Sequence, residues 1–89
     1  MPTNTAAAAR LAELHDYFLS EFDRDAHDNA FAILREIRAQ AVGATCDLPI
    51  ASPAVRLGLW QKLYDRARQF GQTEFALRIM REMRKEDCR

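Results

Sequence analysis

Residues 30–38 read AFAILREIR and residues 76–84 read ALRIMREMR, so two segments 46 positions apart share one pattern. Ala, Ile, Arg, Glu and Arg are identical at that offset, and Leu34/Met80 and Ile37/Met83 are conservative exchanges. One explanation is that amphipathic helices resemble one another, because the helical period alone makes apolar residues recur. The other is that the chain holds two copies of a helical hairpin. Both explanations are open at this point.

Four helices are predicted around these segments, because Ala, Leu, Arg, Glu, Gln and Met dominate the chain and β-branched residues are scarce. Their predicted ranges are 5–22, 26–42, 53–69 and 73–86. Apolar residues recur in each range at the three- and four-residue spacing of a helix face. The predicted core comprises Leu11, Leu14, Phe18, Phe22, Ala30, Ile33, Leu34, Ile37, Ala41, Leu59, Trp60, Leu63, Ala67, Phe70, Phe75, Ala76, Ile79, Met80 and Met83.

Glycine and proline separate the predicted helices. Residues 43–53 read GATCDLPIASP, in which Gly43 suits a helix C-terminus and the two prolines interrupt any helix. Ser52 and Pro53 together are typical of a helix start, because serine can cap the helix and proline at its first position loses no hydrogen bond. Asn4 or Thr5 is expected to cap the first helix. Gly71 is expected to end the third helix, and Thr73 to cap the fourth.

The predicted fold is all-α, with four helices arranged as two pseudo-repeated hairpins joined by a Gly/Pro loop. A chain of 89 residues makes one domain at most, so residues 1–89 are expected to form a single domain. Within it we expect a helical hairpin over 5–42, a loop over 43–53 and a second hairpin over 54–87. No apolar run approaches the ~20 residues of a membrane span. Without a secretory signal, a cytoplasmic protein is predicted.

The two halves of the chain carry opposite charge although the whole is neutral. Residues 1–53 hold four Arg and eight acidic residues, a net charge of −4. Residues 54–89 hold nine Lys or Arg and five acidic residues, a net charge of +4. An acidic hairpin beside a basic one favours docking, within the chain or between chains, over about a Debye length of ~8–10 Å.

The second hairpin resembles a tetratricopeptide-type repeat over about residues 56–87. Trp60, Leu63, Gly71 and Ala76 stand at relative positions 4, 7, 15 and 20 of such a repeat. The segment departs from the family pattern at Tyr64, where the family has a small residue, and the 46-residue offset exceeds the 34 residues of a tandem array. The resemblance implies recognition of proteins or peptides through helix faces, as in adaptors and secretion chaperones.

Signals for catalysis or metal binding are weak. His27 lies among Asp23, Asp25 and Asp28 at a helix start, where a carboxylate-oriented general base is conceivable. The simpler interpretation is that these carboxylates complement the helix dipole. His15, His27, Cys46 and Cys88 show none of the paired spacings of zinc ligands. We therefore expect no enzyme, no cofactor and no metal site.

Nucleic-acid binding is the alternative function. The fourth helix carries Arg78, Arg81, Arg84 and Lys85 on one predicted arc, and the chain from Ala67 to Met80 has the spacing of a helix-turn-helix. Gln72 occupies a position where the turn prefers an apolar residue, and the neutral chain lacks the positive excess of phosphate binders. A solvated arginine face explains the same arc. The alternative is thus a small DNA-binding transcriptional regulator using residues 73–86.

Binding of another protein is the favoured function. Phe31, Leu57 and Leu77 lie off the main apolar stripes of their helices, and such side chains often mark contacts. Isolated exposed apolar residues are also normal. Trp60 is expected in the core because it lies on a buried stripe. The predicted partner-binding residues are Phe31, Leu57, Tyr64, Leu77, Arg78, Arg81 and Arg84.

The favoured class is a small regulatory or adaptor protein. It would act stoichiometrically, as an inhibitor or chaperone, on a protein partner that the sequence does not identify. Four short helices make a thin core, so a homodimer is also expected. Small size and an Ala/Arg-rich composition favour a bacterial or phage origin.

Overall fold

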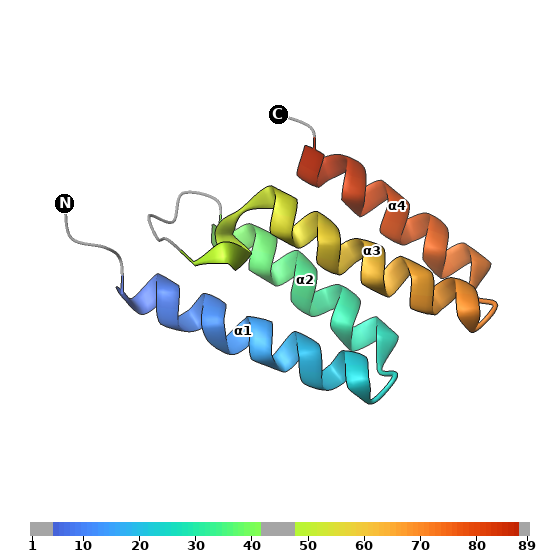
Figure 1. Ribbon diagram of the computed structural model, residues 1–89, viewed down its shortest axis with the longest axis horizontal. Helices are drawn as coiled ribbons and strands as arrows, with labels where there is room; N and C mark the ends of the chain where they lie inside the picture. The colour runs from blue at the N-terminus through green and yellow to red at the C-terminus, as the bar shows by residue number, and fades with distance from the viewer. Residues whose placement is uncertain (1–4, 42–47, 88–89) are drawn as a thin grey trace.

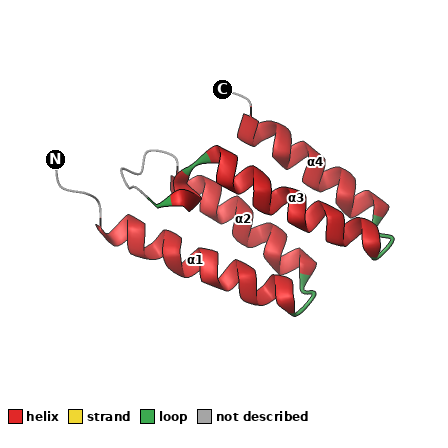
Figure 2. Ribbon diagram, in the orientation of Figure 1, coloured by secondary structure: helices red, strands yellow, loops and turns green. Residues whose placement is uncertain are grey.

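The chain folds into four helices and one short 3₁₀ turn (Figures 1 and 2). The computed structural model describes residues 5–41 and 48–87, and those residues contain no strand. The elements are α1 (Thr5–Asp23), α2 (His27–Ala41), η1 (Pro49–Ala51), α3 (Pro53–Gln69) and α4 (Thr73–Asp87). The helices follow one another across a thin body of 47 × 29 × 15 Å, with α1 and α4 at opposite edges. None of the described helices combines the length and the apolar character that crossing a membrane requires.

The predicted all-α fold and its pairing into hairpins are confirmed. Helix α1 packs along α2 and α3 packs along α4, each pair antiparallel (Figure 1). The predicted bounds of α3 are reproduced, α1 and α4 each end one residue later than predicted, and α2 begins one residue later than predicted. The predicted end of α2 at Val42 lies outside the described residues. The helical period is therefore a sufficient guide to the elements, because nearly every turn carries its apolar residues on one face.

Both hairpins turn through the same hydrogen-bonded motif, 46 residues apart. At the end of α1, the Ala26 N–H donates to the Glu21 carbonyl at 2.9 Å, and the residue before it, Asp25, has a φ of 62°. At the end of α3, the Gln72 N–H donates to the Ala67 carbonyl at 2.9 Å, and Gly71 has a φ of 71°. These are Schellman caps, in which the residue with positive φ favours glycine. The internal repeat is thus present in the backbone.

One core runs through both hairpins and includes a residue from the connecting segment. Fifteen apolar side chains of residues 5–41 and 48–87 are buried, among them Phe18, Leu34, Trp60 and Ile79, each 0 % exposed. Ile50 of η1 joins them at 2 % exposed, because the 3₁₀ turn lies across α1, α2 and α3. The sequence pattern did not identify this residue, since three residues between prolines have no periodicity to detect.

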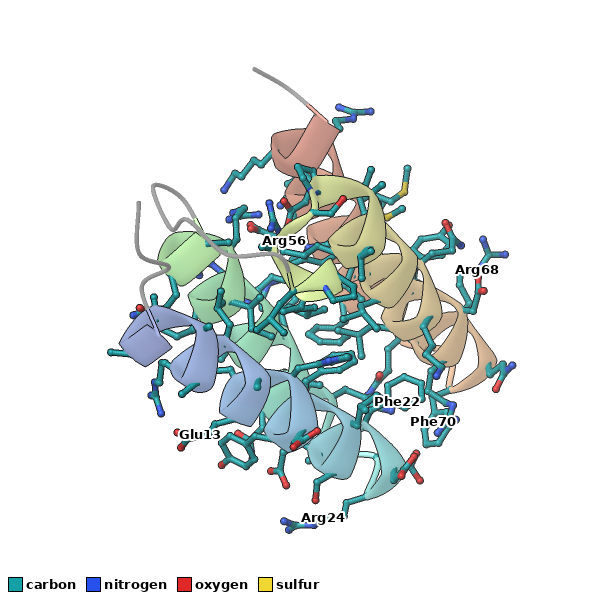
Figure 3. All side chains as sticks on the ribbon, turned by 60° about the vertical axis from the view of Figure 1, so that its left-hand side comes forward. Glu13, Phe22, Arg24, Arg56, Arg68 and Phe70 are labelled. Carbon is teal, nitrogen blue, oxygen red and sulfur yellow. The ribbon has the colours of Figure 1, made fainter. Side chains whose placement is uncertain are left out.

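A buried ion pair links the start of α3 to the end of α4. The Arg56 Nε lies 2.9 Å from Glu86 Oε1, and the two side chains are 6 % and 1 % exposed. The Arg56 guanidinium also donates to the carbonyls of Ile50 and Ala51, and the Trp60 Nε1–H donates to Glu86. Every one of these contacts replaces hydration lost on burial, which a buried charge requires. Figure 3 shows Arg56 inside the body.

Several expectations about side chains are wrong. Phe70 is 52 % exposed and Met80 is 37 % exposed, although both were assigned to the core. Phe70 is the C-cap of α3 and packs against the His27 ring at the hairpin turns, and Met80 lines a shallow surface cavity with Tyr64 and Met83. The Ser52 side chain forms no capping hydrogen bond, although Ser52 does precede α3.

The cap of α4 is not the predicted residue either. Gln72 rather than Thr73 precedes α4, because the Gln72 carbonyl accepts the first helical bond, from Ala76. Asn4 and Gly43, predicted at helix ends, lie outside the described residues.

Candidate partner-binding surfaces

A cationic groove lies between α2 and α4. It has a volume of about 260 Å³ and is lined by Phe31, Arg35, Arg78, Arg81, Glu82 and Lys85. Four of these six side chains are cationic, and they come from two helices that touch only lightly. The groove brings together predicted residues of α4 with Arg35 of α2, which was not predicted. This mainly cationic lining suits an anionic ligand.

Glu82 lies at the base of this groove and holds the two hairpins together. Its carboxylate accepts hydrogen bonds from Arg38 at 2.5 Å and from Lys85 at 3.1 Å, and Arg35 lies 3.9 Å away. Burial alone would raise the pKa of Glu82, but the hydrogen bonds and charges of Arg38 and Lys85 outweigh it and lower that pKa. Glu82 therefore stays ionised and neutralises only one of the surrounding cations.

Phe31 is not an exposed contact residue, as the sequence suggested, but part of the core. It is 5 % exposed, with its ring 5.2 Å from that of Trp60 and 5.5 Å from that of Phe75. The Arg78 guanidinium covers the ring at 4.7 Å. The prediction is wrong because it assumed that α2 buries only one face. Helix α2 packs against α1, α3 and α4, and therefore buries a second face that includes Phe31. Phe31 thus forms the floor of the groove, beneath Arg78.

The predicted arginine arc is divided between two surfaces. Arg78 and Arg81 lie in the cationic groove, whereas Arg84 lies on the far side of α4. There Arg84 lines a shallow cavity of about 310 Å³ together with Gln61, Tyr64, Met80 and Met83. We call this second surface, with Leu77, the outer face of α3 and α4. One helix of 15 residues therefore presents different chemistry to its two sides.

The apolar residues predicted to bind a partner are exposed to different degrees. Leu77 is 49 % exposed, as predicted, whereas Leu57 and Tyr64 are half-buried. The Tyr64 hydroxyl accepts a hydrogen bond from Arg68 at 3.1 Å, which holds the ring along α3. Of the seven predicted residues, Tyr64, Leu77 and Arg84 belong to the outer face, and Phe31, Arg78 and Arg81 to the groove.

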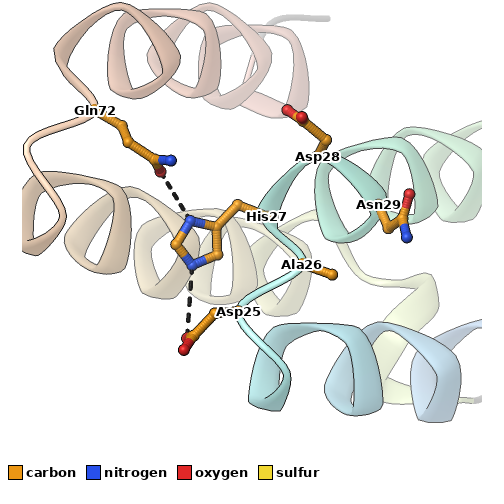
Figure 4. Close-up of a pocket in the computed structure, with 6 residues that line it drawn as sticks. All are labelled: Asp25, Ala26, His27, Asp28, Asn29 and Gln72. Carbon is orange, nitrogen blue, oxygen red and sulfur yellow. Dashed lines mark hydrogen bonds and ion pairs between the residues drawn. The ribbon is translucent and has the colours of Figure 1, made fainter.

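His27 lines a polar pocket where the two hairpin turns meet (Figure 4). Its Nδ1 lies 2.8 Å from the Gln72 amide oxygen, which only accepts, so Nδ1 donates. Its Nε2 is buried without a hydrogen-bond partner among the described residues and lies 3.8 Å from the Asp25 carboxylate. The ring packs against Phe70 at 4.9 Å and Phe75 at 6.4 Å. His27 thus joins the two turns, and no Ser, Cys or Lys lines its pocket.

The other sequence hypotheses concern metal and DNA. Within residues 5–41 and 48–87, no three His, Cys, Asp or Glu side chains gather closely enough to hold a metal ion. Cys46 and Cys88 lie outside those ranges. Helices α3 and α4 run side by side in opposite directions (Figure 1), unlike the steep crossing of a helix-turn-helix. DNA binding through α4 would therefore need a different geometry.

Comparison with known protein families, curated proteins and solved structures found no match to this chain. The tetratricopeptide resemblance of residues 56–87 therefore stays a prediction.

Proposed function

We propose that this chain is a small cytoplasmic adaptor or regulatory protein, without enzymatic activity, that binds an acidic segment of another protein in the groove between α2 and α4. The cationic groove carries this proposal. Arg35, Arg78 and Arg81 reach it from two helices, and a carboxylate-bearing chain laid between the helices would meet all three. Its tetratricopeptide-like hairpin supports the same class of function.

The floor of the groove favours a protein ligand over a bare polyanion. Phe31 lies beneath the cations, and Arg78 is held over its ring rather than extended into water. A peptide offers apolar side chains beside its carboxylates, and an arginine fixed in this way loses little conformational entropy on binding. Duplex DNA instead demands a projecting helix or strand, and α4 lies within the thin helical layer (Figure 1).

The test is the affinity of a fluorescent glutamate-rich peptide, measured by anisotropy. Replacing Arg78 and Arg81 together by alanine should weaken binding by about tenfold or more, because two charge-assisted contacts are lost. The matched control is Arg10→Ala with Lys62→Ala, which removes the same charge from exposed positions outside the groove. Equal affinities of the two double variants would contradict a specific groove.

The alternative of a DNA-binding regulator is tested in the same assay with a labelled duplex. If the duplex binds more tightly than the peptide, and its affinity falls steeply between low and moderate salt, the alternative replaces the proposal. Dependence of that binding on Arg78 and Arg81 would locate it on α4.

A further inference from the structure

The exposed apolar side chains of this protein are related by its internal repeat. Four large apolar residues are substantially exposed in the described ranges: Tyr17, Phe70, Leu77 and Met80. At the offset of 46, three of them correspond to residues that are buried. Leu77 corresponds to Phe31, Met80 to Leu34, and Tyr17 to Leu63. Those three counterparts are 5 %, 0 % and 0 % exposed.

The difference in burial follows from the position of each hairpin. Phe31 is covered because α3 and α4 pack on the first hairpin, where its ring meets Trp60 at 5.2 Å. Leu77 has the same place in the second hairpin, but α4 lies at the edge of the described helices, and Leu77 is 49 % exposed there (Figure 1). Leu63 lies on α3, inside the layer, and is buried, whereas its equivalent Tyr17 lies on α1 at the opposite edge and is 52 % exposed. The two hairpins form one interface within the chain. Helix α4 exposes residues equivalent to one side of that interface, and α1 exposes residues equivalent to the other side.

One ion pair between the hairpins has an oppositely charged equivalent at the offset of 46. Arg38 of the first hairpin binds Glu82 of the second at 2.5 Å. Their equivalents are Arg84 of α4 and Glu36 of α2, which are both exposed and lie on the second helix of each hairpin. If a second copy followed α4 as α3 follows α2, its Glu36 would meet Arg84. Both residues of the equivalent pair, Arg84 and Glu36, are thus present, but they cannot contact each other within one chain.

A second contact is also retained, with its chemistry changed. Phe22 of α1 packs beneath Lys62 and Arg66 of α3, at 5.5 and 4.4 Å. At the offset of 46, Phe22 corresponds to Arg68 and Lys62 to Asp16. Within the chain, this contact is Lys62 over the Phe22 ring. Between two copies stacked in the same register, the equivalent residues would be Asp16 of one copy and Arg68 of the other, a carboxylate and a cation. In Figure 3, Arg68 and Glu13, a neighbour of Asp16 along α1, lie on opposite outer sides of the body.

We propose that the chain binds a second copy of itself head to tail, with α1 of one copy against the outer face of α3 and α4 of the next. Tyr17 of one copy would cover Leu77 and Met80 of its neighbour, and Glu36 would pair with Arg84. The two contacting surfaces are different, so a dimer still has one free α1 surface and one free outer face. Further copies can therefore bind, and assembly continues beyond a dimer. This association uses the outer face and not the cationic groove, so it goes beyond the proposed function and either can fail alone.

Charge reversal tests the register directly. We expect Arg84→Glu and Glu36→Arg each to weaken self-association by at least about tenfold, because each places like charges opposite one another. An equimolar mixture of the two variants should recover it, because Glu at position 84 then meets Arg at position 36 and the natural Arg84 meets the natural Glu36. Sedimentation velocity up to millimolar concentration measures the mass of each sample, and circular dichroism checks that each variant is folded.

Three outcomes would overturn the proposal. A natural chain that stays monomeric at millimolar concentration would exclude self-association, without affecting peptide binding in the groove. A mass that stops at the dimer would exclude the head-to-tail arrangement. Reversed variants that associate as strongly as the natural chain would exclude this register, and Leu77→Ser with Met80→Ser checks the apolar part of the interface independently.

Discussion

The two hairpins share helices and turns but differ in their polar interior. In the second hairpin Arg56, Glu86 and Trp60 form a buried network. The equivalent positions of the first hairpin are Arg10, Gln40 and Leu14, of which Arg10 and Gln40 are exposed. The same place in the repeat is therefore an enclosed ion pair in one copy and open surface in the other.

The connecting segment explains this difference. Residues of η1 cross the start of α3, and the carbonyls of Ile50 and Ala51 accept hydrogen bonds from Arg56 at 3.2 and 2.8 Å. Arg10, at the equivalent position of α1, is exposed. A repeat thus specifies the helix pattern, and the segments between its copies determine which positions become interior. Substitutions at equivalent positions can test this directly.

The largest expected effect comes from Glu86→Ala, which leaves the Arg56 guanidinium buried without its carboxylate. Breaking a buried pair from one side costs about 3–5 kcal/mol of the free energy of unfolding. Urea denaturation followed by circular dichroism measures the loss. The equivalent Gln40→Ala in the first hairpin should stay within about 0.5 kcal/mol. Equal losses in the two variants would show that the hairpins do not differ in this way.

A double replacement separates charge from shape. Arg56→Met with Glu86→Leu removes both charges, and such exchanges of a buried pair are often neutral or stabilising. We expect the double variant to be more stable than Glu86→Ala alone. A double variant as unstable as the single one would mean that the network is needed for packing and not only for mutual neutralisation.

Much of the fold could be predicted from the sequence, because it depends on local signals. Helical periodicity placed four helices, and Gly71 marked a turn that needs a positive φ. The break between residues 22 and 26 was also predicted, but Asp25 has the same backbone conformation without a glycine, so no residue type indicated its positive φ. Ile50 and the partners of Arg56 were missed because their contacts join segments with no common pattern.

The surfaces were less predictable, because they depend on how the hairpins pack. The arc of arginines on α4 was visible in the sequence, but its division between two sides of the helix follows from the position of α2. Phe31 was predicted at the surface because the apolar periodicity of α2 alone does not show that three other helices pack around α2. Arg35 gains its place in the groove, and Arg38 its hydrogen bond to Glu82, from the same packing.

An intermediate effect is expected at Glu82, whose equivalent in the first hairpin is Glu36. Glu82→Gln weakens hydrogen bonds from Arg38 and Lys85 and should cost about 1.5–3 kcal/mol, as for other bonds to charged groups. Glu36 is exposed and contacts Gln40, so Glu36→Gln should change the stability of the monomer little.

The pH dependence distinguishes the role of the Glu82 charge. Because folding lowers the pKa of Glu82 below its ordinary value of 4.5, its carboxylate stabilises the fold above that pH. This stabilisation is lost as the pH falls below 4.5 and through the lowered pKa. The difference between the natural chain and Glu82→Gln should therefore shrink on acidification. A difference that is constant from neutral to acid pH would show that packing, and not charge, stabilises the fold at this position.

The smallest effects are expected at the two turns, and at high salt they should have opposite sign in the two hairpins. Gly71→Ala places a Cβ at a φ of 71° and should cost about 1 kcal/mol, although no atom lies within 4 Å of that Cβ. Asp25→Gly relieves the same strain at a φ of 62° but removes the ion pair of Asp25 with Arg66, which is 47 % and 31 % exposed. Exposed pairs contribute about 0.2–1 kcal/mol, so relief and loss nearly cancel. Measured in 1 M salt, which screens the pair, Asp25→Gly should become stabilising while Gly71→Ala stays destabilising. Destabilisation by both variants at high salt would show that Asp25 is held by its contacts and not strained by its backbone.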